Sequence, residues 1–409
     1  MPKRTVTMDR NTHFDCDWCA PTTENAGMTS TDDFLMALGG PSLIAWHHQN
    51  GIDRSAVEYL NSYRGLLVHG LSAARLIYLD TNFWIRMRDA EIGTGSPAAV
   101  HLLQTLRSMV QSREALCVSQ MYSFLELGKQ KETSLRVTAE LLDELTEGVM
   151  IASPDDLLQW ECAEFIKATL RKDVGHDLCP WTKVGQLHKN DLPTSMPGPV
   201  SDRQRDVILK ASIDAAWNVT FNYILERFDW DTKNKLGFEL DPETFASVTK
   251  RKAEQQAKGL TFDQVRLEGF SEILLSKAGP VFNGLLGRWH FERGFPEGMA
   301  ALLRDADAVQ HAAIQGFAGR SLGRLLPGLS IKTNLYTLYE TDSQSDKPQT
   351  TKDWFDSCHA AVALPYCDLF LTERGLAHRL RQLLKADVQY GCEVVNTIED
   401  AVTCLRNVP

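Results

Sequence analysis

Four short, largely apolar runs along the chain predict buried strands of a parallel sheet. They are residues 76–79, 115–118, 369–371 and 393–395, and a segment with the apolar spacing of a helix follows each of them. Runs this short and this apolar are typical of strands that are covered on both faces. Because strands and helices alternate, the pattern predicts an α/β fold in which helices flank a parallel sheet.

A long helical segment separates the first two predicted strands from the last two. Residues 153–340 show helical periodicity almost throughout, and the long candidate helices are 154–172, 202–228, 242–258 and 296–326. Residues 179–200 contain four prolines and no periodicity, which predicts a loop or a lid. We therefore expect an α/β domain in two parts, 75–150 and 345–409, interrupted by a large all-α insertion at 151–344.

The N-terminal region is expected to lie outside this α/β domain. Residues 1–30 are polar and irregular, which predicts a flexible tail. Residues 31–74 carry apolar side chains at helical spacing, so we expect a helical segment that packs beside the domain.

Composition is that of a globular protein of the cytoplasm. The 409 residues are too many for one typical domain, and the hydrophobic fraction of 43% is ordinary. With a net charge of -10, any nucleic-acid surface must be a local patch or be supplied by bound metal. The nine cysteines are an odd number and are scattered, which is typical of reduced thiols. No run is long enough to cross a bilayer and no signal-peptide core is present, so no membrane partner is expected.

Acidic residues stand at or near the carboxyl ends of the predicted strands, or in the first turns of nearby helices. They are Asp80, Glu126, Asp356 and Glu373. In open α/β sheets the carboxyl ends of the strands share one edge, and ligands bind outside that edge. We therefore expect these four side chains to converge although they lie far apart in the sequence.

Two of these acids also have simpler interpretations. Asp80 ends a predicted strand, so it is equally well placed to be the N-cap of the next helix. Glu126 lies on a helix that Ser119 is expected to cap, and Lys129 and Gln130 are its nearest polar neighbours in the sequence. A solvated helix face is therefore the alternative for Glu126.

Converging carboxylates predict a metal site, because they repel one another unless a cation or a proton lies between them. Oxygen ligands without paired His or Cys suit Mg²⁺ or Mn²⁺ rather than zinc. Such a site activates water and stabilises the leaving oxygen of a phosphodiester. The candidate phosphate contacts are Asn82, Arg374 and Arg379, which lie close in the sequence to the acids.

This pattern resembles the PIN domain, a metal-dependent ribonuclease fold. The resemblance rests on residues 77–82, 119–126 and 356–373 and covers about 75–150 and 345–405. It implies that Asp80, Glu126, Asp356 and Glu373 are the catalytic acids, and that the first three bind Mg²⁺ or Mn²⁺. The family more often has Asp in the last position, so Asp368 is the alternative to Glu373 as the fourth metal ligand.

The resemblance implies a PIN-like metal-dependent endoribonuclease that hydrolyses single-stranded or structured RNA, with a regulatory protein or a second copy of the chain as a further partner. The alternative is a catalytically degenerate PIN-fold protein whose helical insertion recognises a protein or nucleic-acid partner. A phosphatase that forms a phospho-aspartate ranks below both, because such an enzyme normally carries a second Asp where this chain has Asn82.

Overall fold

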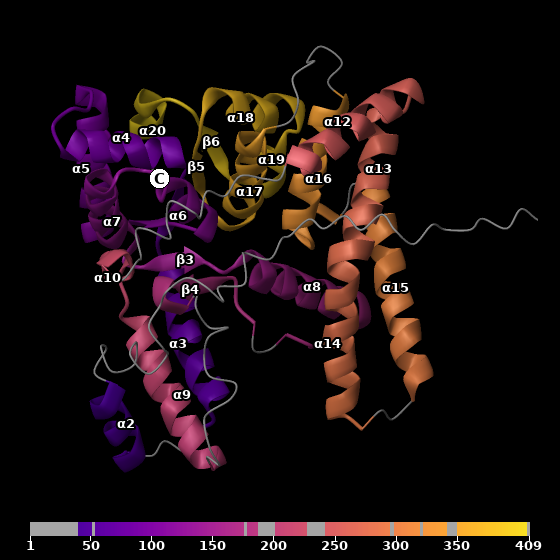
Figure 1. Cartoon of the computed structure of the whole chain (residues 1–409), viewed down its shortest axis with the longest axis horizontal. Coiled ribbons are helices and arrows are strands. Elements are labelled where there is room, and N and C mark those ends of the chain that lie inside the picture. Colours follow the sequence, from indigo (N-terminus) through magenta and orange to yellow (C-terminus); the bar gives the residue numbers. More distant parts are fainter. Residues whose placement is uncertain are drawn as a thin grey trace, which may run out of the picture.

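The computed structural model describes residues 40–50, 54–175, 178–186, 201–226, 242–294, 298–319, 322–341 and 350–406. The predicted N-terminal tail, 1–30, and the first part of the helical segment 31–74 lie outside these residues. In the described part the chain is mostly helical, with a four-stranded parallel sheet and a two-stranded antiparallel sheet (Figure 1).

The four predicted strands are confirmed and form the parallel sheet. Its strands are β1 (Arg75–Leu79), β2 (Ala115–Val118), β5 (Leu369–Leu371) and β6 (Glu393–Val395), in the order β2-β1-β5-β6. Tyr78 of β1 stands opposite Val118 on one side and Phe370 on the other, and all three side chains are fully buried. The apolar runs thus fill the middle of the sheet, as strands covered on both faces require.

Helices from both ends of the sequence cover the parallel sheet. In Figure 1, α4, α5, α6, α7 and α20 lie to one side of the strands, and α17, α18 and α19 lie to the other. These helices are α4 (Thr81–Glu91), α5 (Pro97–Gln111), α6 (Met121–Leu127), α7 (Glu132–Thr146), α17 (Thr351–Tyr366), α18 (Arg374–His378), α19 (Ala386–Tyr390) and α20 (Ile398–Arg406). A π-helical turn, Arg379–Leu383, follows α18.

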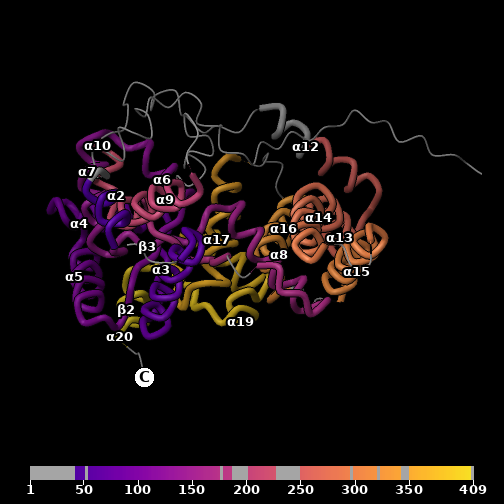
Figure 2. The backbone as a smooth tube through the Cα atoms, turned by 90° about the horizontal axis from the view of Figure 1, so that it is seen from below, coloured from indigo at the N-terminus to yellow at the C-terminus, as the bar shows by residue number. Residues whose placement is uncertain are grey.

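The central segment supplies most of the remaining helices. They are α8 (Pro154–Leu170), α9 (Asp202–Trp217), α10 (Phe221–Glu226), α12 (Pro242–Ala257), α13 (Phe262–Ile273), α14 (Gly279–Glu292), α15 (Met299–Ala318) and α16 (Pro327–Thr341). A second apolar core lies among α8 and α13–α16, where the rings of Phe270 and Phe317 stack with centroids 3.7 Å apart. In Figure 2, α13, α14 and α15 of this second core lie at the opposite end of the molecule from α4 and α5.

The expectation of an all-α central segment is wrong in one place. β3 (Val149–Ile151) and β4 (Trp181–Lys183) form an antiparallel pair, so part of the predicted loop at 179–200 is a strand. Residues 187–200 lie outside the described part. β4 has the sequence Trp181-Thr182-Lys183, so it lacks the apolar run that marks the strands of the parallel sheet.

The predicted helix 202–228 is divided into α9 and α10. Asp143 of α7 is the physical reason, because its carboxylate accepts hydrogen bonds from the backbone N–H groups of Phe221 (2.6 Å) and Asn222 (3.1 Å). An acceptor at this point satisfies the first N–H groups of a new helix. The side chain that binds the start of α10 thus lies 78 to 79 residues earlier in the chain.

The N-terminal helices pack on α9 of the central segment. They are α2 (Gly40–Gln49) and α3 (Ala56–Leu71). Asp214 of α9 accepts hydrogen bonds from the hydroxyl groups of Tyr59 (2.7 Å) and Tyr63 (2.9 Å) and lies 2.8 Å from Nε2 of His47. Across the ranges given above, no helix combines the length and the apolar content that a bilayer crossing requires.

Candidate functional site

The candidate site lies where the order of the parallel strands changes direction. β1 pairs with β2 on one side and with β5 on the other, so the carboxyl ends of β1 and β5 mark the switch point of the sheet. In open α/β sheets the crevice outside these ends is the usual ligand site. Asp80 directly follows β1, and Thr372 and Glu373 directly follow β5.

Asp80 joins the ends of these two strands. Its Oδ2 accepts hydrogen bonds from the Thr372 hydroxyl (2.8 Å) and from the backbone N–H of Glu373 (3.0 Å). Its Oδ1 accepts from the backbone N–H of Phe83 (3.1 Å), which makes Asp80 the N-cap of α4. Burial raises the pKa of Asp80, although these hydrogen bonds act in the opposite direction. Asp80 is therefore the N-cap of α4, as its simpler interpretation expected, and it also lies at the switch point of the sheet.

Glu126 is held by partners that are distant in the sequence. Its Oε2 accepts a hydrogen bond from the Thr81 hydroxyl and lies 2.8 Å from Nε2 of His359 on α17. Burial acts to raise the pKa of Glu126, but the bonds from His359 and Thr81 outweigh it and leave that pKa below its ordinary value. Gln120, rather than the predicted Ser119, is the N-cap of α6. Glu126 thus belongs to the site and not to a solvated helix face.

Asp356 and Glu373 form the second acidic pair of the site. Burial raises the pKa of Asp356 to about 7, and the negative charge of Glu373 acts in the same direction. Arg379 lies 3.0 Å from Asp356 and 3.9 Å from Asp353, while Lys352 forms an ion pair with Glu373. The two carboxylates are therefore close enough to repel each other, and the protein's own cations offset part of that charge.

The structure does not bring Asp368 to this site, so that expectation is corrected. Asp368 precedes β5, and its Oδ2 accepts a hydrogen bond from the backbone N–H of Leu76 (2.7 Å) at the start of β1. Asp80 lies four residues further along the same chain direction, which is about 13 Å of extended strand. Asp368 is therefore at the amino edge of the sheet and is excluded as the fourth ligand.

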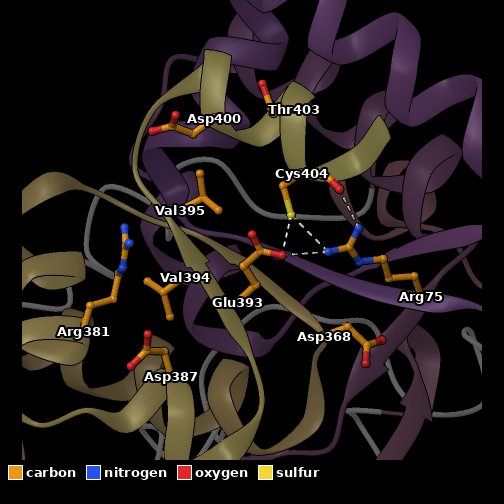
Figure 3. Close-up of a pocket in the computed structure, with 10 residues that line it drawn as sticks. All are labelled: Arg75, Asp368, Arg381, Asp387, Glu393, Val394, Val395, Asp400, Thr403 and Cys404. Carbon is orange, nitrogen blue, oxygen red and sulfur yellow. Dashed lines mark hydrogen bonds and ion pairs between the residues drawn. The ribbon is translucent and has the colours of Figure 1, made fainter. Parts of the chain in front are cut away.

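Asp368 instead borders a groove of about 800 Å³ at the amino edge of the sheet (Figure 3). In this groove Arg75 donates hydrogen bonds to Glu393 (3.2 Å) and to the backbone oxygen of Cys404 (3.0 Å). The Cys404 thiol donates to Glu393 (2.7 Å), and burial and this carboxylate raise the pKa of Cys404 to about 11. The thiol therefore stays protonated at neutral pH. None of the four candidate acids lines this groove, so it is separate from the switch point.

The predicted phosphate contacts fall into two groups. Arg379 is engaged with acidic side chains, and its guanidinium also lies 4.8 Å from the ring centre of Tyr339. Asn82 and Arg374 are exposed. Asn82 is the second residue of α4, which follows β1, and Arg374 is the first residue of α18, which follows β5. Asn82 and Arg374 are thus the predicted contacts that a ligand can reach without breaking an ion pair.

The donor chemistry of the site fits a hard cation. Within residues 40–406 as described, no group of three or more His, Cys, Asp and Glu side chains is arranged to bind a metal. The available donors are carboxylate oxygens, which Mg²⁺ and Mn²⁺ prefer. The repulsion between Asp356 and Glu373 is of the kind that a cation relieves.

Several residues of the site could not be identified as such from the sequence. Tyr78 lies inside an apolar run that reads only as a strand, and Thr372 is one of many hydroxyl residues. His359 had a weak signal, because it follows Asp356 by three residues and so shares its helix face.

No protein-family model, curated protein or solved structure matches this chain.

Proposed function

We propose that this chain is a metal-dependent endoribonuclease built on a PIN-like α/β domain that a helical segment interrupts. The observation that carries the proposal is the position of Asp80 at the switch point, bonded to both Thr372 and Glu373. Glu126 joins this position through Thr81, and the charge of Glu373 reaches Asp356. These four acids lie on separate segments of the chain, and such a set of carboxylates is of the kind that holds the metal of a phosphodiester hydrolase.

Asp80, Glu126, Asp356 and Glu373 would hold Mg²⁺ or Mn²⁺ in this proposal. When bound, the ion supplies a water of lowered pKa and stabilises the charge on the leaving oxygen. The exposed Arg374 is placed to receive a substrate phosphate next to Glu373, since one guanidinium group can donate two parallel hydrogen bonds to a phosphate. Single-stranded or structured RNA as the substrate rests on the resemblance to the PIN family, as does the choice of RNA over DNA.

The second candidate is a degenerate member of the same fold that binds a protein or nucleic-acid partner and cleaves nothing. It is favoured by the side chains that already lie against the acids. Arg379 forms an ion pair with Asp356, Lys352 forms one with Glu373, and His359 is hydrogen-bonded to Glu126. When basic side chains of the protein already offset the charge of these acids, a metal ion is not needed to keep the acids close together.

Cleavage assays with matched variants separate the two candidates. Purified protein is incubated with labelled RNA and DNA pools in Mn²⁺, Mg²⁺ or EDTA, and Mn²⁺ binding is measured by calorimetry. We expect metal-dependent RNA cleavage in the wild type and in Asp368→Asn, which alters the other edge of the sheet, and none in Asp80→Asn. Equal cleavage by folded Asp80→Asn would refute the nuclease. Absence of both cleavage and stoichiometric Mn²⁺ binding in the wild type would favour the binding protein.

A further inference from the structure

Tyr78 carries a hydroxyl group at the centre of the parallel sheet, where none is needed for packing. The residue is fully buried in β1 between β2 and β5. Its hydroxyl lies 2.9 Å from the Ser123 hydroxyl of α6 and 2.7 Å from Nδ1 of His359 on α17. A buried phenol is stable when its polar end is hydrogen-bonded, so these two contacts are the reason that Tyr is tolerated here.

The hydrogen bonds around His359 form one continuous chain. Because the Glu126 carboxylate can only accept, Nε2 of His359 donates to its Oε2 at 2.8 Å. The Tyr78 hydroxyl bridges Nδ1 of His359 and the Ser123 hydroxyl, donating to one of them and accepting from the other. The Thr81 hydroxyl donates to the same Oε2 of Glu126 from the other side. Every hydrogen in this chain has an acceptor, which fixes the orientation of the imidazole ring.

This chain of hydrogen bonds leaves one oxygen of Glu126 available. Both hydrogen bonds to its carboxylate, from Thr81 and His359, fall on Oε2. Within the described part of the chain, Oε1 of Glu126 accepts no hydrogen bond. A carboxylate fixed through one oxygen and open at the other is suited to bind a cation.

We propose that His359 is the positioning residue of the site, which holds the Glu126 carboxylate so that Oε1 faces a bound divalent cation. The proposal rests on the nuclease function above and extends it to a residue with no direct metal contact. His359 suits this role because it lies on the same helix as Asp356, three residues later. The His359–Glu126 contact thus joins the two helices that carry Glu126 and Asp356.

Substitutions of His359 can separate its two ring nitrogens. Gln places a donor near the position of Nε2 and so can still reach Glu126, whereas Asn reaches only the position of Nδ1. Tyr78→Phe keeps the ring and removes the hydroxyl that orients the imidazole. His290→Gln is the matched control, because His290 is equally buried and lies 2.8 Å from Asp305 in the second core.

The experiment measures the Kd of Mn²⁺ by calorimetry, together with circular dichroism to confirm folding. We expect His359→Asn to weaken Mn²⁺ binding by about 10–100-fold, which is typical when a partner of a metal ligand is lost. His359→Gln should restore most of the affinity, Tyr78→Phe should fall between them, and His290→Gln should match the wild type. Cleavage rates should follow the same order.

The outcomes distinguish this inference from the function on which it rests. An unchanged Kd in folded His359→Asn, with Asp80→Asn still unable to bind Mn²⁺, overturns the positioning role and leaves the nuclease standing. Equal losses in His359→Asn and His359→Gln also overturn it, since packing rather than the donor at Nε2 would then matter. A wild type that binds no Mn²⁺ overturns both proposals.

Discussion

Replacing Glu161 by Gln should change how the stability of the protein depends on pH. Glu161 lies on α8 and is only 1% exposed. The backbone N–H of Gly328 donates to both of its carboxylate oxygens at 3.1 Å, and the Tyr366 hydroxyl donates to one of them at 2.7 Å. This carboxyl group therefore connects α8 with α16 and α17, and α17 carries Asp356.

Burial sets the expected magnitude. It raises the pKa of Glu161 from 4.5 to about 7, although Tyr366, Gly328 and Lys332 act to lower it. One pKa unit corresponds to about 1.4 kcal/mol of free energy. The folded chain keeps this proton at pH values where the unfolded chain has lost it. The resulting stabilisation is present below pH 4.5 and is lost as the pH rises through 7.

Urea unfolding of the wild type and Glu161→Gln between pH 5 and pH 8 tests this reasoning. Gln does not titrate, so the variant's free energy of unfolding relative to the wild type should rise by about 2–3 kcal/mol over this range. Asp356, whose pKa is also raised to about 7, titrates in both proteins and cancels. Glu164→Gln, on the exposed face of α8, is the matched control for the loss of one carboxyl group from this helix. A constant difference between Glu161→Gln and the wild type would refute the buried, proton-retaining carboxyl group.

Three further predictions address the site and the central segment. Asp368→Asn should leave the Kd of Mn²⁺ unchanged, because Asp368 lies at the amino edge of the sheet; calorimetry that finds a weakened site would return it to the ligand set. Gly185→Ala should destabilise the fold by about 3 kcal/mol or more in urea unfolding, because the new Cβ would lie 2.1 Å from the backbone oxygen of Ala216; near wild-type stability would contradict this close packing. Mn²⁺ at 100 times its Kd should stabilise the wild type by about 2.7 kcal/mol in thermal unfolding, reversed by EDTA and absent in Asp80→Asn; an equal gain in that variant would place the ion elsewhere.

The strands and most helices of this protein were predictable because their signals are local. A run such as 76–79 is buried on both faces wherever it lies, so its composition alone predicts a central strand. Where an element depends on a distant partner, prediction failed. β3 and β4 are each three residues long and pair with each other, and the first N–H groups of α10 are bonded to Asp143 of α7.

The acidic residues of the site could be proposed from the sequence, but their partners could not. The position of Asp80 after β1 follows from chain order, as does that of Glu373 after β5. Asp368 precedes β5, so chain order also implied its place at the amino edge of the sheet, and its hydrogen bond to Leu76 agrees with this. His359 and Glu126 are separated by 233 residues, and only the packing of α17 against α6 brings them within hydrogen-bonding distance. Local pattern thus determined the elements and their acids, whereas tertiary packing decided which acids meet and which cations hold them.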